Sequence, residues 1–306
     1  MAFDAFALIL TMLALGMVFA RLKLLPGNAA EVLNLVVLYV CLPAAVLIYV
    51  PRLHVDASLL GVIVTPWLLA VVTVALVTLA TRAFGFRRDE HAVLLLCVAL
   101  GNTSFIGYPM VRALLGEDAL PYAVVYDQFG TFLLLSTFGL YVLAKYGGDA
   151  PPTFRQVLLR IVKFPPVWAL LLGLTVMPQQ PPTWIAAGLQ KLADALLPLV
   201  MLAVGLSIQL KMPRDEVKPL AVGLLLKLVI LPALALPLAL LFGLHDDMLQ
   251  VSVLESAMPT MITAGALAIA HNLAPRLAAA LVGYGILLSL VTLPAWVWVL
   301  GWISHS

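Results

Sequence analysis

Ten long apolar stretches separated by short loops dominate this sequence. A membrane-spanning helix needs about 20 apolar residues, and most of these stretches reach that length. Hydrophobic residues make up 63% of the chain and charged residues only 10%, whereas a soluble domain is about one quarter charged. The sequence therefore predicts an all-α integral membrane protein with the lipid bilayer as its surroundings. The predicted spans are Phe3–Ala20, Ala30–Val50, Leu59–Ala83, Ala92–Leu115, Tyr122–Ala144, Phe164–Met177, Trp184–Leu210, Leu220–Leu244, Leu249–Ala270 and Leu277–Trp302.

The loops on the two sides of the predicted membrane region differ in charge. Lysine and arginine gather in the loops that follow the first, third, fifth, seventh and ninth spans, whereas the opposite loops carry acids such as Glu117, Asp118 and Asp246. Because basic loops stay in the cytoplasm, both termini are expected outside it, in a bacterial-type inner membrane. The net charge of +2 gives no reason to expect a nucleic-acid partner.

Prolines recur at matching places in the two halves of the chain. Pro43 and Pro198 are separated by nearly the same number of residues as Pro109 and Pro259. Each half holds five predicted spans, and five is odd, so the second half must enter the membrane from the opposite side. The spacing predicts a five-plus-five inverted-topology repeat with halves 1–150 and 151–306, together forming one membrane domain.

Two of the predicted spans contain residues that interrupt a helix. The fourth span holds GNTSFIGYPM (residues 101–110), and the ninth holds ESAMPT (residues 255–260). Proline removes a helical hydrogen bond, glycine weakens a helix, and freed backbone groups at membrane depth need protein or water around them. Interrupted spans at corresponding places in two repeats predict a transporter's binding site, near the middle of the bilayer.

Half-helix N-termini at such breaks carry unpaired N–H groups and partial positive charge, which suit an anion. A merely kinked helix whose Ser and Thr cap freed carbonyls is the alternative. The candidate substrate-binding residues lie in or beside the two interruptions: Asn102, Thr103, Ser104, Tyr108, Pro109, Pro259, Thr260 and Thr263.

Four ionisable residues fall within predicted spans: Asp127, Asp194, Lys227 and Glu255. Each charge costs about 3 kcal/mol at a helix centre, so these side chains are expected to face the interior, to pair or to be neutral. Our hypothesis is that Asp127 or Glu255 takes up and releases a proton, with Lys227 as the counter-charge. A static ion pair is the alternative, and H⁺ and Na⁺ both stay open as coupling ions.

Other chemistry is not indicated. The histidines lie at span ends or tails without metal-ligand spacing, and Cys41 and Cys97 lie within apolar spans. No nucleophile–base set or phosphate loop is present. We therefore expect no cofactor, no metal site and no enzymatic activity.

Several of these segments resemble one known family. GNTSFIGYPMVRALLGED is similar to the fourth-helix signature of the auxin efflux carrier family, LADALLPLVMLAVGLSIQL to its seventh helix and AMPTMITAGALAIAHN to its ninth. The resemblance implies ten helices, with broken helices four and nine crossing at the substrate site, in a fold related to the sodium–bile acid symporter family. It also implies scaffold and transport subdomains that move as an elevator, and a homodimer through the scaffold.

The resemblance extends to single residues. Asn102 matches the family's crossover asparagine, a substrate ligand, and Pro109 and Pro259 match its crossover prolines. Asp127 and Glu255 are not part of the plant motif. The short stretch between the fifth and sixth spans is typical of bacterial members, some of which resemble malate or malonate permeases.

We therefore expect a secondary active transporter, a permease or efflux carrier, for a small organic anion. A carboxylate such as malate, malonate or an auxin-like acid would be carried by elevator-type alternating access. Two alternatives stay open: a sodium- or proton-coupled cation exchanger or symporter of the same fold, and a non-transporting membrane sensor.

Overall fold

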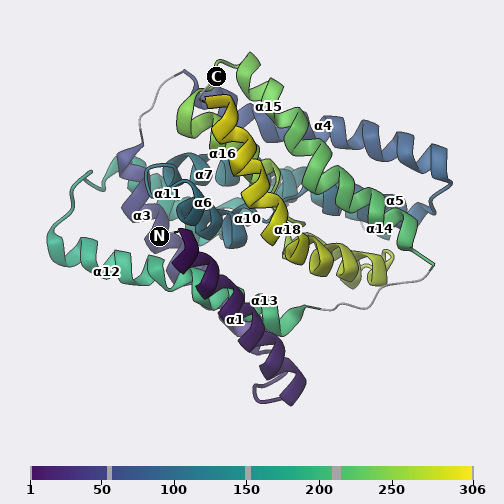
Figure 1. Cartoon of the computed structure of the whole chain (residues 1–306), viewed down its shortest axis with the longest axis horizontal. Coiled ribbons are helices and arrows are strands. Elements are labelled where there is room, and N and C mark those ends of the chain that lie inside the picture. The colour runs from purple at the N-terminus through teal and green to yellow at the C-terminus, as the bar shows by residue number, and fades with distance from the viewer. Residues whose placement is uncertain (1, 54–56, 149–152, 209–214, 305–306) are drawn as a thin grey trace. The chain divides into compact units, whose positions relative to one another are not determined.

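The computed structural model describes residues 2–53, 57–148, 153–208 and 215–304. Within these ranges the chain consists of helices and connecting loops, with one isolated antiparallel bridge between Gly101 and Thr260 (Figure 1). The predicted all-α class is therefore confirmed for the described residues. The boundary expected between the two halves, at residues 150 and 151, lies outside them.

Six helices of the described chain are long and apolar enough to cross a membrane. Two shorter apolar helices, Ala7–Leu22 and Pro165–Thr175, correspond to the first and sixth predicted spans. The fourth and ninth predicted spans are each divided into shorter helices. The protein is thus an integral membrane protein. The six long helices are Ala29–Arg52, Leu59–Phe84, Leu120–Gly147, Thr183–Ser207, Val217–Leu241 and Pro275–Trp302.

Packing divides the chain into two units, each built from both halves of the sequence. Unit 1 comprises Met1–Val55, Ser104–Val124 and Ile161–Ile208. In this unit α1 packs along α13, and α3 packs against α11 and α12. Its helices are α1 (Ala2–Leu22), α2 (Ala29–Val36), η1 (Val37–Cys41), α3 (Leu42–Tyr49), η2 (Val50–Arg52), α6 (Tyr108–Leu114), α11 (Pro165–Thr175), α12 (Thr183–Asp194) and α13 (Leu196–Ser207).

Unit 2 comprises Asp56–Thr103, Val125–Arg160 and Gln209–Ser306. Here α15 packs against α4 and α16, and α18 packs against α14, α16 and α17 (Figure 1). Its helices are α4 (Leu59–Phe84), α5 (Arg88–Ala99), η4 (Asp127–Thr131), α8 (Phe132–Leu134), η5 (Leu135–Gly139), α9 (Leu140–Gly147), α14 (Val217–Leu225), η6 (Leu226–Ile230), α15 (Leu231–Leu241), α16 (Asp246–Ser256), α17 (Ile262–Ala270) and α18 (Pro275–Ser304).

Three helical segments contain the points where the chain passes from one unit to the other. They are the π-helical turn η3 (Thr103–Gly107), α7 (Leu120–Tyr126) and α10 (Phe154–Val162).

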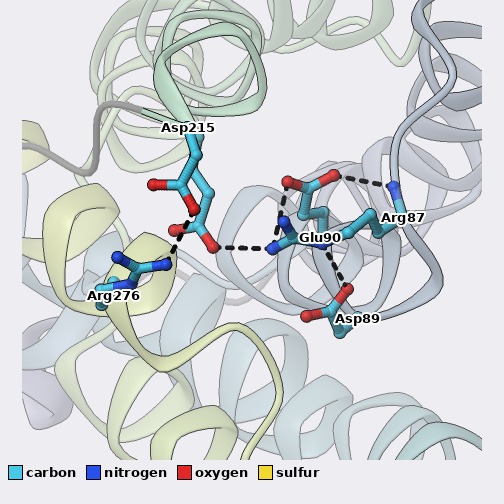
Figure 2. Close-up of polar contacts among 6 residues, drawn as sticks. Arg87, Asp89, Glu90, Asp215 and Arg276 are labelled. Atoms are coloured by element: carbon cyan, nitrogen blue, oxygen red, sulfur yellow. Dashed lines mark hydrogen bonds and ion pairs between the residues drawn. The ribbon is translucent and has the colours of Figure 1, made fainter.

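Charged side chains join the start of α5 to the segment that precedes α14, and that segment to α18 (Figure 2). The Arg87 guanidinium lies 2.8 Å from the carboxylate of Glu216, just before α14, and the Arg87 backbone N–H donates to Glu90. Arg276, in the first turn of α18, pairs with Asp215 at 2.8 Å. These contacts fix the end of α5 that lies opposite the interruption.

Two glycines let α1 and α13 approach closely in unit 1. A Cβ added to Gly205 would overlap the carbonyl oxygen of Leu13, and one added to Gly16 would overlap that of Leu202. Small residues that allow backbones to touch are the usual means of packing helices in a membrane, where burial of apolar surface supplies little drive.

We expect Gly205→Ala to destabilise the protein by about 1–3 kcal/mol, the usual cost of overpacking, because the obstructing atoms belong to backbone. The measurement is the thermal unfolding midpoint in detergent. Gly188→Ala on α12 is the matched control, since a Cβ there meets nothing within 4 Å and the exchange favours a helix. Equal midpoints for the two variants would contradict the close contact.

Candidate functional site

Two helices of unit 2 stop within the apolar core. Helix α5 ends at Ala99, and the next residue, Leu100, already has extended backbone angles. Helix α16 ends at Ser256, and α17 begins only at Ile262. Both interruptions that the sequence predicts are therefore present.

The two extended stretches pair with each other. The Asn102 N–H donates to the Pro259 carbonyl at 2.8 Å, and the Met261 N–H donates to the Leu100 carbonyl at 2.9 Å. Gly101 and Thr260 form the antiparallel bridge between these bonds. Each break thus satisfies backbone groups that the other has freed, as non-helical backbone at membrane depth requires.

The first break is not where its proline suggests. Pro259 lies within the extended stretch of the second break, but Pro109 lies in α6. The π-helical turn η3 runs directly into α6, so the helix that follows the first break begins at Thr103, and Pro109 lies within it. The expectation that Pro109 marks the break of the fourth span is therefore wrong: the interruption lies at Leu100–Asn102.

The side chains at the crossing have different surroundings. The Thr260 hydroxyl donates to the carbonyl of Cys97 at 2.8 Å, so it caps one of the last carbonyls of α5. Asn102 is 1% exposed, and its Nδ2 has no hydrogen-bond partner among the described residues. An unpartnered buried donor costs about 1–3 kcal/mol and calls for an explanation such as an absent ligand.

The N-terminus of α17 lies beside this pairing. Its first N–H groups have no acceptor within the helix, and a helix N-terminus carries partial positive charge. Thr263, in the first turn, is half-buried. The crossing in unit 2 therefore combines a free amide donor with a helix end that favours an anion.

A charged cluster adjoins the crossing. Lys227 and Glu255 line a cavity of about 10 Å³, which is room for about one water molecule. The Lys227 ammonium donates to the Ser256 carbonyl at 3.2 Å. A Cβ on Gly101 would lie 3.0 Å from the Lys227 nitrogen. Glycine at position 101 therefore lets the ammonium reach the bridge.

Asp127 joins the same cluster through Thr103. The Thr103 hydroxyl, which lines the cavity, donates to Asp127 Oδ1 at 2.5 Å, and the Gln128 amide donates to Oδ2 at 2.8 Å. Glu255 is fully buried, yet neither of its carboxylate oxygens has a hydrogen-bond partner among the described residues. The two acids thus have opposite hydrogen-bonding environments.

Other sequence-predicted residues lie in unit 1. Tyr108, Pro109 and Asp194 line a cavity of about 500 Å³, and Ser104 is half-buried in the same unit. Asp194, which the sequence places within the seventh predicted span, lines this cavity, and its side chain is 49% exposed. Helix α12 ends at Asp194 and α13 begins at Leu196, and Ala195 between them keeps helical backbone angles.

Sequence reasoning missed the basic residue of this cavity. Arg112 pairs with Asp194 at 2.5 Å and with Glu117 at 2.6 Å. Tyr49 donates to Glu117 and accepts from Gln190. The available signal is Arg112 itself, a basic residue three positions after Pro109 within an apolar span.

Comparisons with known proteins show that the chain is similar to membrane transporters. The family described as "Membrane transport protein" matches residues 1–297. An uncharacterized transporter of Methanothermobacter thermautotrophicus is 31% identical over 293 residues, which cover 94% of this chain and 95% of that protein. The uncharacterized transporter YfdV of Escherichia coli K12 is 23% identical over 305 residues, 95% of each chain. Auxin efflux carrier component 6 of Arabidopsis thaliana is 26% identical over 187 residues, 60% of this chain and 31% of the plant protein.

We expect Thr260→Val to lower the free energy of unfolding by about 1–3 kcal/mol, because it leaves the Cys97 carbonyl buried without a donor. The measurement is the thermal unfolding midpoint in detergent. The control is Thr73→Val. Thr73 is also buried, but its hydroxyl donates to the Leu69 carbonyl of its own helix, and that carbonyl keeps its helical N–H donor when the hydroxyl is removed. A loss for Thr73→Val as large as that for Thr260→Val would contradict the capping role.

Proposed function

The chain belongs to the Membrane transport protein family, which includes the auxin efflux carriers, and we propose that it transports a small organic anion. The family is one of transporters, not enzymes. The substrate class we propose is a carboxylate, such as malate, malonate or an auxin-like acid. The protein is an integral membrane transporter in any case.

One observation carries the anion proposal: the buried Nδ2 of Asn102, beside two mutually paired helix breaks, has no hydrogen-bond partner in the part of the chain that the structure describes. A carboxylate oxygen is a good acceptor for an amide donor, and hydrogen bonds to charged groups are stronger than those to neutral ones. The first turn of α17 adds N–H groups and the positive end of a helix dipole. We propose Asn102 and Thr263 as the binding side chains of unit 2, with the Pro259 and Thr260 backbone shaping the crossing. The Thr103 hydroxyl has one hydrogen to donate and donates it to Asp127, so Thr103 supports the site from beside Asn102.

We propose ten spans in two inverted five-span repeats. Six long apolar helices, two shorter apolar ones and the two interrupted segments account for the ten predicted spans. The pairing of the two interruptions supports the idea that they occupy equivalent positions in the two repeats. In this arrangement both termini lie outside the cytoplasm of a bacterial-type inner membrane.

We further propose elevator-type alternating access, in which unit 2 is the transport subdomain and unit 1 the scaffold. The support is that each unit draws helices from both halves of the sequence, and that both interruptions fall in unit 2. Ser104, Tyr108 and Pro109 then belong to the scaffold side of the chain, and a homodimer would form through unit 1.

A second candidate function is cation exchange without an organic substrate. The fully buried Glu255, whose oxygens have no hydrogen-bond partner among the described residues, favours it. The two functions differ in whether a carboxylate binds at all.

We expect a carboxylate to stabilise the purified protein, and Asn102→Leu to abolish that stabilisation, since Leu keeps the volume but removes the donor. A ligand at 100 times its Kd raises the free energy of unfolding by about 2.7 kcal/mol. The measurement is a thermal-shift screen of monocarboxylates, dicarboxylates and indole acids, followed by uptake of the best ligand into liposomes.

The matched control is Ser252→Ala. Ser252 is as buried as Asn102, lies in unit 2 and also has an unpartnered polar atom among the described residues. Ser252→Ala is expected to keep the ligand-induced shift. If no carboxylate stabilises the wild-type protein, or if Asn102→Leu keeps the full shift, the anion site proposed here is wrong.

A further inference from the structure

We propose that Glu255 is the site where a transported proton binds, that Asp127 stays ionised, and that the coupling ion is H⁺ rather than Na⁺. The inference deepens the proposed function and rests on it for the link to substrate. It selects one of two acids and one of two ions that the sequence leaves open.

The hydrogen bonds distinguish the two acids. Both oxygens of Asp127 accept hydrogen bonds, from Thr103 and from Gln128. Donors of this kind stabilise a carboxylate in its charged form. Asp127 therefore remains an anion, and the ammonium of Lys227, which lines the cavity beside Glu255, supplies one positive charge to the cluster.

Glu255 has the opposite environment. It is 0% exposed, and neither of its oxygens has a hydrogen-bond partner among the described residues. Burial without donors disfavours the charged form of a carboxyl group. With Asp127 and Lys227 both charged, an ionised Glu255 would leave the cluster with one uncompensated negative charge. A proton on Glu255 removes that charge and adds almost no volume.

The cavity beside Glu255 suits a proton better than a metal ion. Its volume is about 10 Å³, and hard cations need several oxygen ligands around them. The Lys227 ammonium lines the same cavity and would repel a second cation. The other titratable lining residue is Tyr126, and α4, α5 and α15 contribute only Pro66, Leu69, Ala99 and Leu231. The polar remainder is Thr103, Thr131 and Ser256.

The position of Glu255 ties its proton to the anion site. Its backbone carbonyl accepts the Met258 N–H at the end of α16, immediately before the stretch that pairs with Leu100–Asn102. A negative charge on Glu255 would oppose an anion at Asn102, and a proton on Glu255 would favour it. Proton and anion then bind together, so a monocarboxylate moves with one proton and no net charge.

The proton site is tested first without any substrate. Infrared difference spectra of the protein in liposomes, recorded between acid and alkaline pH, are expected to show a protonated-carboxyl C=O band. The band should disappear in Glu255→Gln, shift in frequency in Glu255→Asp and persist in Asp127→Asn. Glu216→Gln is the matched control: Glu216 is 2% exposed and paired with Arg87 in the same unit, and its variant should keep the band.

A transport assay in liposomes is the second part of the test. Uptake of the stabilising carboxylate into liposomes is expected to be driven by an imposed pH gradient and to be unaffected by a sodium gradient. A single titrating carboxyl changes the initial rate by about tenfold per pH unit on its steep limb. Glu255→Gln should abolish this pH dependence and gradient-driven accumulation while keeping substrate exchange at equal pH. Glu216→Gln should behave as the wild type.

The outcomes separate the two proposals. A carboxyl band that keeps its frequency in both Glu255 variants overturns the proton site. Uptake driven by sodium alone overturns it as well. A band that disappears in Glu255→Gln, together with no binding of any carboxylate, supports the proton site and overturns the organic-anion function instead. If Glu255→Gln fails to fold, the frequency shift in Glu255→Asp decides the assignment, and an unshifted band overturns it.

Discussion

The pairing between Leu100–Asn102 and Pro259–Met261 is the interaction on which the rest of unit 2 depends. Each stretch exposes backbone groups that a continuous helix would have satisfied, and in an apolar medium an unpaired group costs several kcal/mol. The two hydrogen bonds across the bridge, at 2.8 and 2.9 Å, remove that cost for both stretches at once. Neither interruption is stable without the other, so the helix ends that they create are held at one place.

The same lack of water governs the charged residues. A charge at the centre of a span costs about 3 kcal/mol, and the structure reduces that cost in different ways in the two units. In unit 1, Arg112, Asp194 and Glu117 are partly exposed and pair directly. In unit 2, Asp127 takes its hydrogen bonds from neutral donors, and the Lys227 ammonium bonds a carbonyl that the end of α16 has freed. The helix interruption therefore supplies part of the polar environment that the charges require.

The sequence predicts the features that depend on local chemistry, and fails where tertiary contacts decide. The length of the apolar stretches predicts the spans. Both interruptions are predicted by the glycines, polar residues and prolines in residues 101–110 and 255–260. The position of the first break, however, does not follow from its proline: the chain is extended at Leu100–Asn102, whereas Pro109 lies beyond η3, in α6. Asp194 was placed with the other charges because depth along a span can be counted, whereas its pairing with Arg112 joins residues that are distant in sequence. Asn102 can be named from its motif, but only the structure shows that its Nδ2 has no hydrogen-bond partner among the described residues.

Gly101 shows how closely the candidate anion site and the charged cluster are connected. It forms the bridge to Thr260, and a Cβ at this position would lie only 3.0 Å from the Lys227 nitrogen. The next residue, Asn102, has a side-chain amide without a hydrogen-bond partner among the described residues, and the one after it, Thr103, donates to Asp127. Three consecutive residues thus contact the second interruption, hold a free donor and stabilise a carboxylate. Because Gly101 lines the same cavity as Lys227 and Glu255, a change in charge at either residue would change the electrostatic potential at the neighbouring Asn102. Electrostatic coupling between the two sites therefore needs no long pathway through the protein.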